Sequence, residues 1–113
     1  MKTIQYYHDT KLYFKKFLKP NKFSDNENLL KYYDLYENNI KAFIEKELGW
    51  NINIYFTNIN NSPKPMKEWF YIIENGQELY SSDEYEQNKL LTYELALNKA
   101  IQCIFKNIYQ INI

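Results

Sequence analysis

Trp69-Phe-Tyr-Ile-Ile-Glu-Asn-Gly-Gln-Glu-Leu-Tyr80 is the stretch that decides the predicted fold. Asn75-Gly76 separates two apolar runs, and both residues accept the positive φ angles that a type I′ hairpin turn requires. The stretch therefore predicts a β-hairpin with a two-residue turn at Asn75-Gly76. A turn of this length also determines the register, so Ile72 is expected to lie opposite Leu79.

Both faces of the predicted hairpin are apolar. Side chains alternate across a strand, so one face is expected to carry Phe70, Ile72 and Leu79. The opposite face is expected to carry Trp69, Tyr71, Ile73 and Tyr80. We expect the helices to pack on the face of Phe70, which leaves the opposite face without a cover. Either residues 1–18 of the same chain or a partner protein is then needed to cover it.

Local patterns predict the other elements. A capping box at Ser24 and Glu27 begins a predicted helix that ends at Gly49, with apolar residues at three-to-four spacing between them. Residues 51–59 alternate between apolar and polar and predict a half-buried strand, whereas residues 60–65 predict a loop. A second long helix is expected to begin at residues 81–84 and to continue to Ile108.

The N-terminal residues 1–22 are expected to form an arm or a short helix. Asp9 or Thr10 can cap a helix that runs to Lys19, and residues 3–7 are an alternative short strand. The whole chain, residues 1–113, is predicted to be a single α+β domain. Its core, residues 24–108, has the order α-β-β-β-α: a three-stranded antiparallel sheet with two long helices on one face.

Charge and composition narrow the classes of function. The 14 basic residues are all lysines and balance 14 acids, so the net charge of zero gives no general attraction to nucleic acid or membranes. Residues 1–22 are basic and residues 67–95 are acidic. No apolar run is long enough for a membrane span, and the only cysteine, Cys103, excludes an intrachain disulfide. A cytoplasmic protein is expected.

The sequence carries no recognisable catalytic motif. His8 is the only histidine, and Cys103 falls within a predicted amphipathic helix, where a packed thiol is expected. One histidine and one cysteine do not make an ordinary zinc site, and both glycines are used in a stop or a turn. We therefore predict a protein that is not an enzyme and that has no metal or cofactor.

The order of elements over residues 24–108 resembles that of the double-stranded-RNA-binding domain. That family presents lysines at the start of its last helix to contact phosphates. The matching residues here, Ser82-Asp-Glu-Tyr-Glu86, would repel RNA. An alternative nucleic-acid site is the N-terminal arm with Lys11, Lys15, Lys16, Lys19 and Lys22.

A second resemblance lies in the C-terminal half. The segments Trp69-Phe-Tyr-Ile, Asn75-Gly76, Ser82-Asp-Glu-Tyr and Leu91-Thr-Tyr-Glu-Leu-Ala-Leu-Asn-Lys-Ala100 resemble small uncharacterised proteins from phages and mobile elements of A/T-rich bacteria. This resemblance implies an accessory protein that binds a host protein or blocks a host defence.

Protein binding is the function that these observations favour. The expected partner-binding residues are the aromatic and aliphatic side chains of the second sheet face: Trp69, Tyr71, Ile73, Tyr80 and Tyr55. The partner would be an unidentified protein, with inhibition of a host protein as one form of the activity. The two alternatives are a nucleic-acid-binding accessory protein that uses the lysine arm and a structural subunit of a homo-oligomer.

Overall fold

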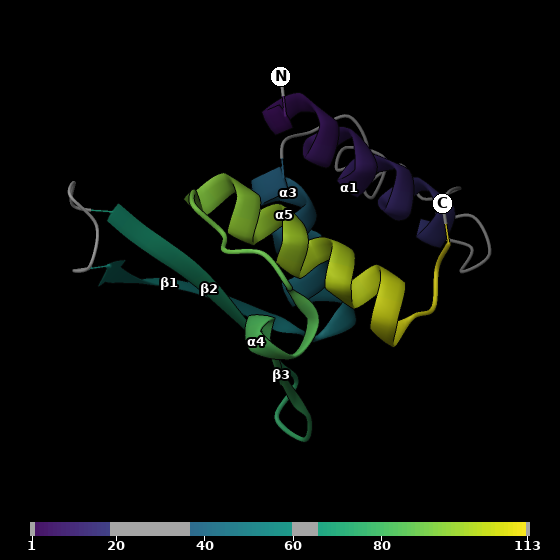
Figure 1. Cartoon of the computed structure of the whole chain (residues 1–113). Coiled ribbons are helices and arrows are strands. Elements are labelled where there is room, and N and C mark those ends of the chain that lie inside the picture. Colours follow the sequence, from purple (N-terminus) through teal and green to yellow (C-terminus); the bar gives the residue numbers. More distant parts are fainter. Residues whose placement is uncertain (1, 19–36, 60–65, 113) are drawn as a thin grey trace.

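The computed structural model describes residues 2–18, 37–59 and 66–112 of the chain. Strands β1 (Asn51–Ile59), β2 (Met66–Glu74) and β3 (Leu79–Ser81) form one antiparallel sheet in the order β1-β2-β3. Helices α1 (Lys2–Leu18), α3 (Glu37–Phe43) and α5 (Tyr93–Cys103) lie on one side of this sheet (Figure 1). The chain therefore has the α+β fold that the sequence predicts.

The helix before the sheet ends where the sequence predicts. α3 continues into a π-helical turn, η1 (Ile44–Leu48), and Gly49 follows with a φ of 77°. Glycine has no Cβ and adopts this left-handed conformation at little cost, so the chain can leave the helix and enter β1. The capping box at Ser24 and Glu27 lies outside the described residues.

The hairpin turn lies one residue later than predicted. Gly76 has a φ of 91°, whereas Asn75 does not have a positive φ. The N–H of Asn75 donates to the Glu78 carbonyl at 3.2 Å, and its side-chain Oδ1 accepts from the Gln77 and Glu78 N–H groups at 2.9 and 2.7 Å. The Glu78 N–H thus donates to the side-chain oxygen of Asn75, where a hairpin would ordinarily use the Asn75 backbone carbonyl. The two-residue loop is Gly76-Gln77.

This shift changes the strand register without moving any side chain to the other face. Ile73 lies opposite Tyr80, and Glu74 lies opposite Leu79. Moving the turn centre by one residue changes the pairing by two residues, and the side-chain period of a strand is also two. The two predicted sets of residues therefore stay together on their faces.

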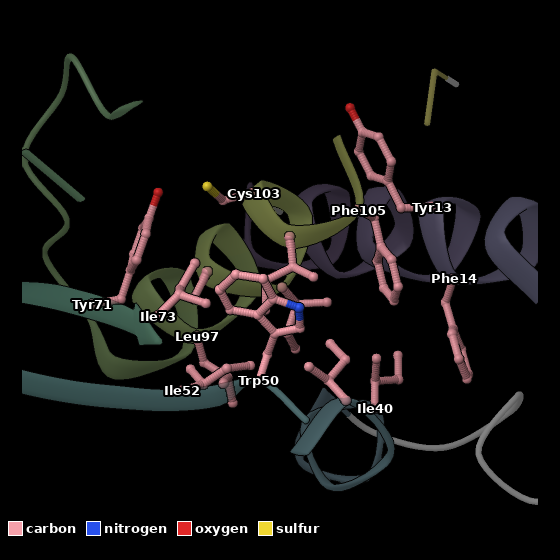
Figure 2. Packing of buried hydrophobic residues seen from close by; sticks show 14 of the residues in the cluster. Tyr13, Phe14, Ile40, Trp50, Ile52, Tyr71, Ile73, Leu97, Cys103 and Phe105 are labelled. Atoms are coloured by element: carbon pink, nitrogen blue, oxygen red, sulfur yellow. The ribbon is translucent and has the colours of Figure 1, made fainter. Parts of the chain in front are cut away.

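The prediction of which face the helices cover is wrong. Ile52 of β1 lies opposite Ile73, and Ile54 lies opposite Tyr71, so the apolar side of β1 extends the face of Tyr71 and Ile73. Figure 2 shows Ile52, Tyr71 and Ile73 on the side of the strands that faces α5, and Tyr71 and Ile73 are fully buried. Which face of the sheet is more apolar depends on how β1 pairs with β2. The sequence of residues 60–65 does not indicate that register, so the covered face could not be predicted from the hairpin alone.

The last long helix begins at Tyr93, which corrects the predicted start at residues 81–84. Its N-cap is Thr92, whose Oγ1 accepts a hydrogen bond from the Leu95 N–H at 3.1 Å. Helix α4 (Ser82–Tyr85) is only one turn long, and the segment after it contacts the edge of β2 where Leu90 bridges Trp69. α5 continues into a π-helical turn, η2 (Ile104–Ile108).

The chain between β3 and α5 completes the edge of β2. Because β3 has only three residues, it does not reach the N–H groups of Tyr71 and Trp69. The Tyr71 N–H donates to Ser82 Oγ at 3.3 Å, and the Trp69 N–H donates to the Leu90 carbonyl at 2.7 Å. These backbone groups require partners when buried, and the bond from Trp69 to Leu90 explains why the long helix does not continue from α4 and begins only after Leu90.

The N-terminal residues form helix α1, which is the helix alternative of the two predicted, and they leave no strand at residues 3–7. The helix begins at Lys2 and not after a cap at Asp9 or Thr10. It packs on α5, η2 and α3, with the ring of Phe14 5.1 Å from that of Phe43 and the ring of Phe17 5.2 Å from that of Phe105. Helix α5 packs against β1 and β2. The face of Tyr71 is therefore covered by α5, and not by residues 1–18 as one alternative proposed.

Candidate functional site

The outer face of the sheet, opposite the helices, carries four large apolar side chains on three neighbouring strands. We call this group the outer-face cluster; its members are Tyr55, Phe70, Ile72 and Leu79. The Tyr55 ring stacks on the Phe70 ring with their centroids 5.3 Å apart and their planes at 18°. Tyr55 is 40% exposed and Leu79 is 59% exposed. Within the described part of the chain, all long helices lie on the other side of the sheet (Figure 1).

The charges that border this cluster on the strands are negative. Glu68 precedes Phe70 by two residues and Glu74 follows Ile72 by two residues, so both lie on the outer face. Asn51 Nδ2 donates to Glu74 Oε1 at 3.4 Å on the same face. The only lysine in the three strands, Lys67, lies on the opposite face, where its Nζ is 4.4 Å from the centroid of the Phe56 ring.

The structure separates the five predicted partner-binding residues. Tyr71 and Ile73 are fully buried, and Trp69 and Tyr80 are half-buried against the same core. Only Tyr55 lies on the outer face. The buried pair cannot contact a partner while α5 stays in place. The outer-face cluster therefore replaces those residues as the candidate binding surface.

The buried Tyr71 hydroxyl has a polar partner. It donates a hydrogen bond to Glu86 Oε2 at 2.8 Å. Burial, with a smaller effect from the neighbouring Cys103 and Glu86 side chains, raises the pKa of Tyr71 far above its ordinary value of 10.0. The hydroxyl therefore stays protonated and acts as a hydrogen-bond donor over the whole physiological range.

Cys103 lies beside Tyr71, at a hollow of about 230 Å³. The hollow is lined by residues from four segments: Tyr13, Tyr85, Glu86, Lys99, Gln102, Cys103, Lys106 and Asn107. Burial raises the pKa of the Cys103 thiol, although its Sγ accepts a hydrogen bond from Asn107 Nδ2 at 3.4 Å. A nucleophilic cysteine needs a lowered pKa and a neighbouring base, and this hollow contains neither a histidine nor an activated thiolate.

Three of the five predicted basic residues lie on α1, far from the outer face. Lys11, Lys15 and Lys16 are on α1, with α5 between them and the sheet (Figure 1). Lys16 Nζ donates to the Asn112 carbonyl at 2.6 Å, which ties α1 to the C-terminal segment. Lys19 and Lys22 lie outside the described residues. His8 is exposed on the same helix.

The described ranges of the chain contain neither a cluster of metal ligands nor a membrane-spanning helix. Over residues 2–18, 37–59 and 66–112, no three side chains of His, Cys, Asp and Glu gather as a metal ion would require. No helix in these ranges is both long enough and apolar enough to cross a membrane. Comparison with protein-family models, curated proteins and solved structures finds no match for this chain.

Proposed function

We propose that this chain is a non-enzymatic protein-binding module whose outer-face cluster binds a basic, amphipathic segment of another protein. The observation that carries this proposal is the outer-face cluster itself: Tyr55 and Leu79 are exposed, Phe70 and Ile72 are half-buried, and no helix of the described residues covers this face. Glu68 and Glu74 lie beside the cluster on β2. Grouped apolar side chains of this kind usually mark an interaction site on a protein surface.

The chemistry of the cluster supports a protein partner. Large aromatic side chains such as Tyr55 and Phe70 supply much of the binding energy at protein interfaces. The carboxylates of Glu68 and Glu74 favour lysine or arginine on the partner, because opposite charges across an interface steer binding and select partners. The same carboxylates repel phosphate, which disfavours nucleic acid on this face.

The resemblance to small phage and mobile-element proteins supports the setting of this proposal. In that setting the partner is a host protein and binding inhibits it. The basic segment would then belong to the host protein.

Two synthetic amphipathic helical peptides test the proposal. They share one leucine face and carry either lysine or glutamate on the other face. We expect the lysine peptide to bind at least about ten-fold more tightly at low salt and to lose affinity as salt is added. Fluorescence anisotropy of labelled peptides measures both effects. Equal affinity for the two peptides would contradict the proposed role of the acids.

Matched leucine variants locate the binding surface. Leu79 and Leu91 are 59% and 48% exposed, and only Leu79 belongs to the outer-face cluster. Leu79→Ser is expected to weaken binding of the lysine peptide, whereas Leu91→Ser is expected to leave it unchanged. A second pair, Glu68→Gln and Glu74→Gln, is expected to remove the preference for lysine while some apolar binding remains. If Leu91→Ser weakens binding as much as Leu79→Ser, the outer face is not the site.

A further inference from the structure

Among the described residues, no strand pairs with the outer edge of β1 along its second half. Alternate residues of an antiparallel strand point their N–H and C=O groups toward the partner strand, and the others point them away. The Ile52 N–H points away from β2, because it donates to Glu45 Oε2 at 3.1 Å. By the same alternation, Ile54, Phe56 and Asn58 present their backbone groups at the outer edge. β1 is the last strand of the sheet, and nothing in the described part of the chain pairs with it there.

Other open N–H groups of the sheet have partners. Ser82 and Leu90 accept from the N–H groups of Tyr71 and Trp69, which β3 does not reach. The carboxylate of Glu45, which also forms an ion pair with Lys41 at 2.9 Å, accepts from the first outward N–H of β1. The second half of β1 lacks comparable protection among the residues that the structure describes.

β1 also lacks the residues with which proteins usually block an open edge. Its nine residues, Asn51–Ile59, include no charged residue, no proline and no glycine. Natural edge strands are usually protected by lysines, prolines, bulges or a covering segment. A long, uncharged edge strand therefore favours pairing with another strand. If that strand is β1 of a second copy, the pairing places no like charges opposite each other.

We infer that β1 pairs antiparallel with β1 of a second copy of this chain. This pairing joins two three-stranded sheets into one across a two-fold axis. One register uses all three outward residues: Phe56 lies opposite Phe56 of the second copy, and Ile54 lies opposite Asn58. Every open backbone group from Ile54 to Asn58 then has a partner.

The side chains fit this register. Phe56 is 44% exposed, and in the pair it meets its own copy on the helix side of the sheet, where aromatic cross-strand pairs are favourable. On the outer face, Tyr55 meets Thr57 of the second copy. The inference goes beyond the proposed function, because it uses the strand edge and leaves Phe70, Ile72 and Leu79 of the outer-face cluster free.

A charge exchange at Thr57 tests the inference in sedimentation equilibrium. In this register the two Thr57 residues lie diagonally, about 7–8 Å apart, which is within the screening length at physiological salt. We expect the wild-type chain to be dimeric at about 100 µM, where a micromolar interaction is largely formed. Thr57→Lys alone and Thr57→Glu alone should raise the dissociation constant at least about ten-fold, whereas an equimolar mixture of the two should recover the dimer.

Further variants separate pairing from folding. Thr57→Gln is the neutral control and should remain dimeric. Asn58→Pro removes one outward N–H and no bond to β2, so it should weaken the dimer, whereas Asn58→Ala should not. Circular dichroism melts check that each variant is folded.

Two results would overturn the inference. One is a wild-type chain that stays monomeric at about 100 µM, which would leave the edge to a strand of a different protein. The other is a dimer that persists in both Thr57→Lys and Thr57→Glu. Peptide binding at the Leu79 surface is measured separately, so failure of one proposal is distinguishable from failure of the other.

Discussion

Ile52 lies directly opposite Ile73 in the pairing of β1 with β2, and both side chains are buried beneath the helices. Figure 2 shows the two isoleucines on the same side as Leu97 of α5. Ile72, one residue earlier in β2, has the same chemistry but lies on the outer face. Of these two adjacent isoleucines, Ile73 thus belongs to the hydrophobic core and Ile72 to the outer-face cluster.

This relationship predicts different stabilities for two neighbouring variants. Ile73→Ala removes a fully buried side chain and is expected to lower the free energy of unfolding by about 2–5 kcal/mol. Ile72→Ala removes the same atoms from the outer face and is expected to cost about 1 kcal/mol or less. Urea unfolding followed by circular dichroism measures both. Equal losses would show that the outer face is covered.

Much of the fold could be predicted from local sequence. The strand at residues 51–59 and the helix end at Gly49 match the structure, because alternation and a left-handed stop act within a few residues. The late start of α5 could not be predicted in this way. Ser82 and Leu90 are held by β2, so the helix start depends on a contact between distant segments.

The candidate site was only partly predictable. The hairpin divides its side chains into the two predicted sets, but the choice between faces depends on where β1 pairs. The sequence therefore predicts an exposed face of Trp69, Tyr71, Ile73 and Tyr80, whereas in the structure these side chains pack against the core. The alternating sequence of β1 does indicate the outer face at one residue. Tyr55 falls on the polar side of this strand, away from Ile52 and Ile54.

The turn offers a test of backbone conformation alone. A Cβ placed on Gly76 meets nothing within 4 Å, so a substitution there is opposed by the φ of 91° and not by a clash. Gly76→Ala is expected to lower the free energy of unfolding by about 1–2 kcal/mol. Gly76→Asn should cost less, because asparagine tolerates positive φ. If the two variants are equally stable, a negative φ at residue 76 in solution would be indicated.

The attachment of α1 to α5 depends on a buried polar pair. Gln102 Nε2 donates to Thr10 Oγ1 at 2.9 Å, and Thr10 is fully buried. Thr10→Val removes this acceptor but keeps the shape of the side chain, so the free energy of unfolding is expected to fall by about 1–3 kcal/mol. Thr10→Ser retains the hydroxyl and should lose less. Hydrogen exchange should show the greatest loss of protection in α1, and unchanged protection there would argue against the contact.

The last prediction concerns alkaline pH and the Tyr71 hydroxyl. Burial holds the pKa of Tyr71 above its unfolded value of 10.0, so folding favours the protonated form. The resulting stability is fully present below about pH 10 and is lost as the pH rises toward the folded-state pKa. Tyr71→Phe has no group to ionise at this position. The stability advantage of wild type over Tyr71→Phe should therefore fall above pH 10, by up to about 1.4 kcal/mol per pH unit.

A third variant identifies the cause of this pH dependence. Burial is the largest cause of the raised Tyr71 pKa, and the hydrogen bond to Glu86 is a smaller one. Glu86→Gln removes the neighbouring charge and keeps an oxygen that can accept from the hydroxyl. Relative to a Tyr71→Phe, Glu86→Gln double variant, it should still lose stability above pH 10. Urea unfolding of all four proteins between about pH 8 and pH 11 gives the comparison. If the pH-dependent loss disappears with Glu86→Gln, the carboxylate and not burial controls the ionisation of Tyr71.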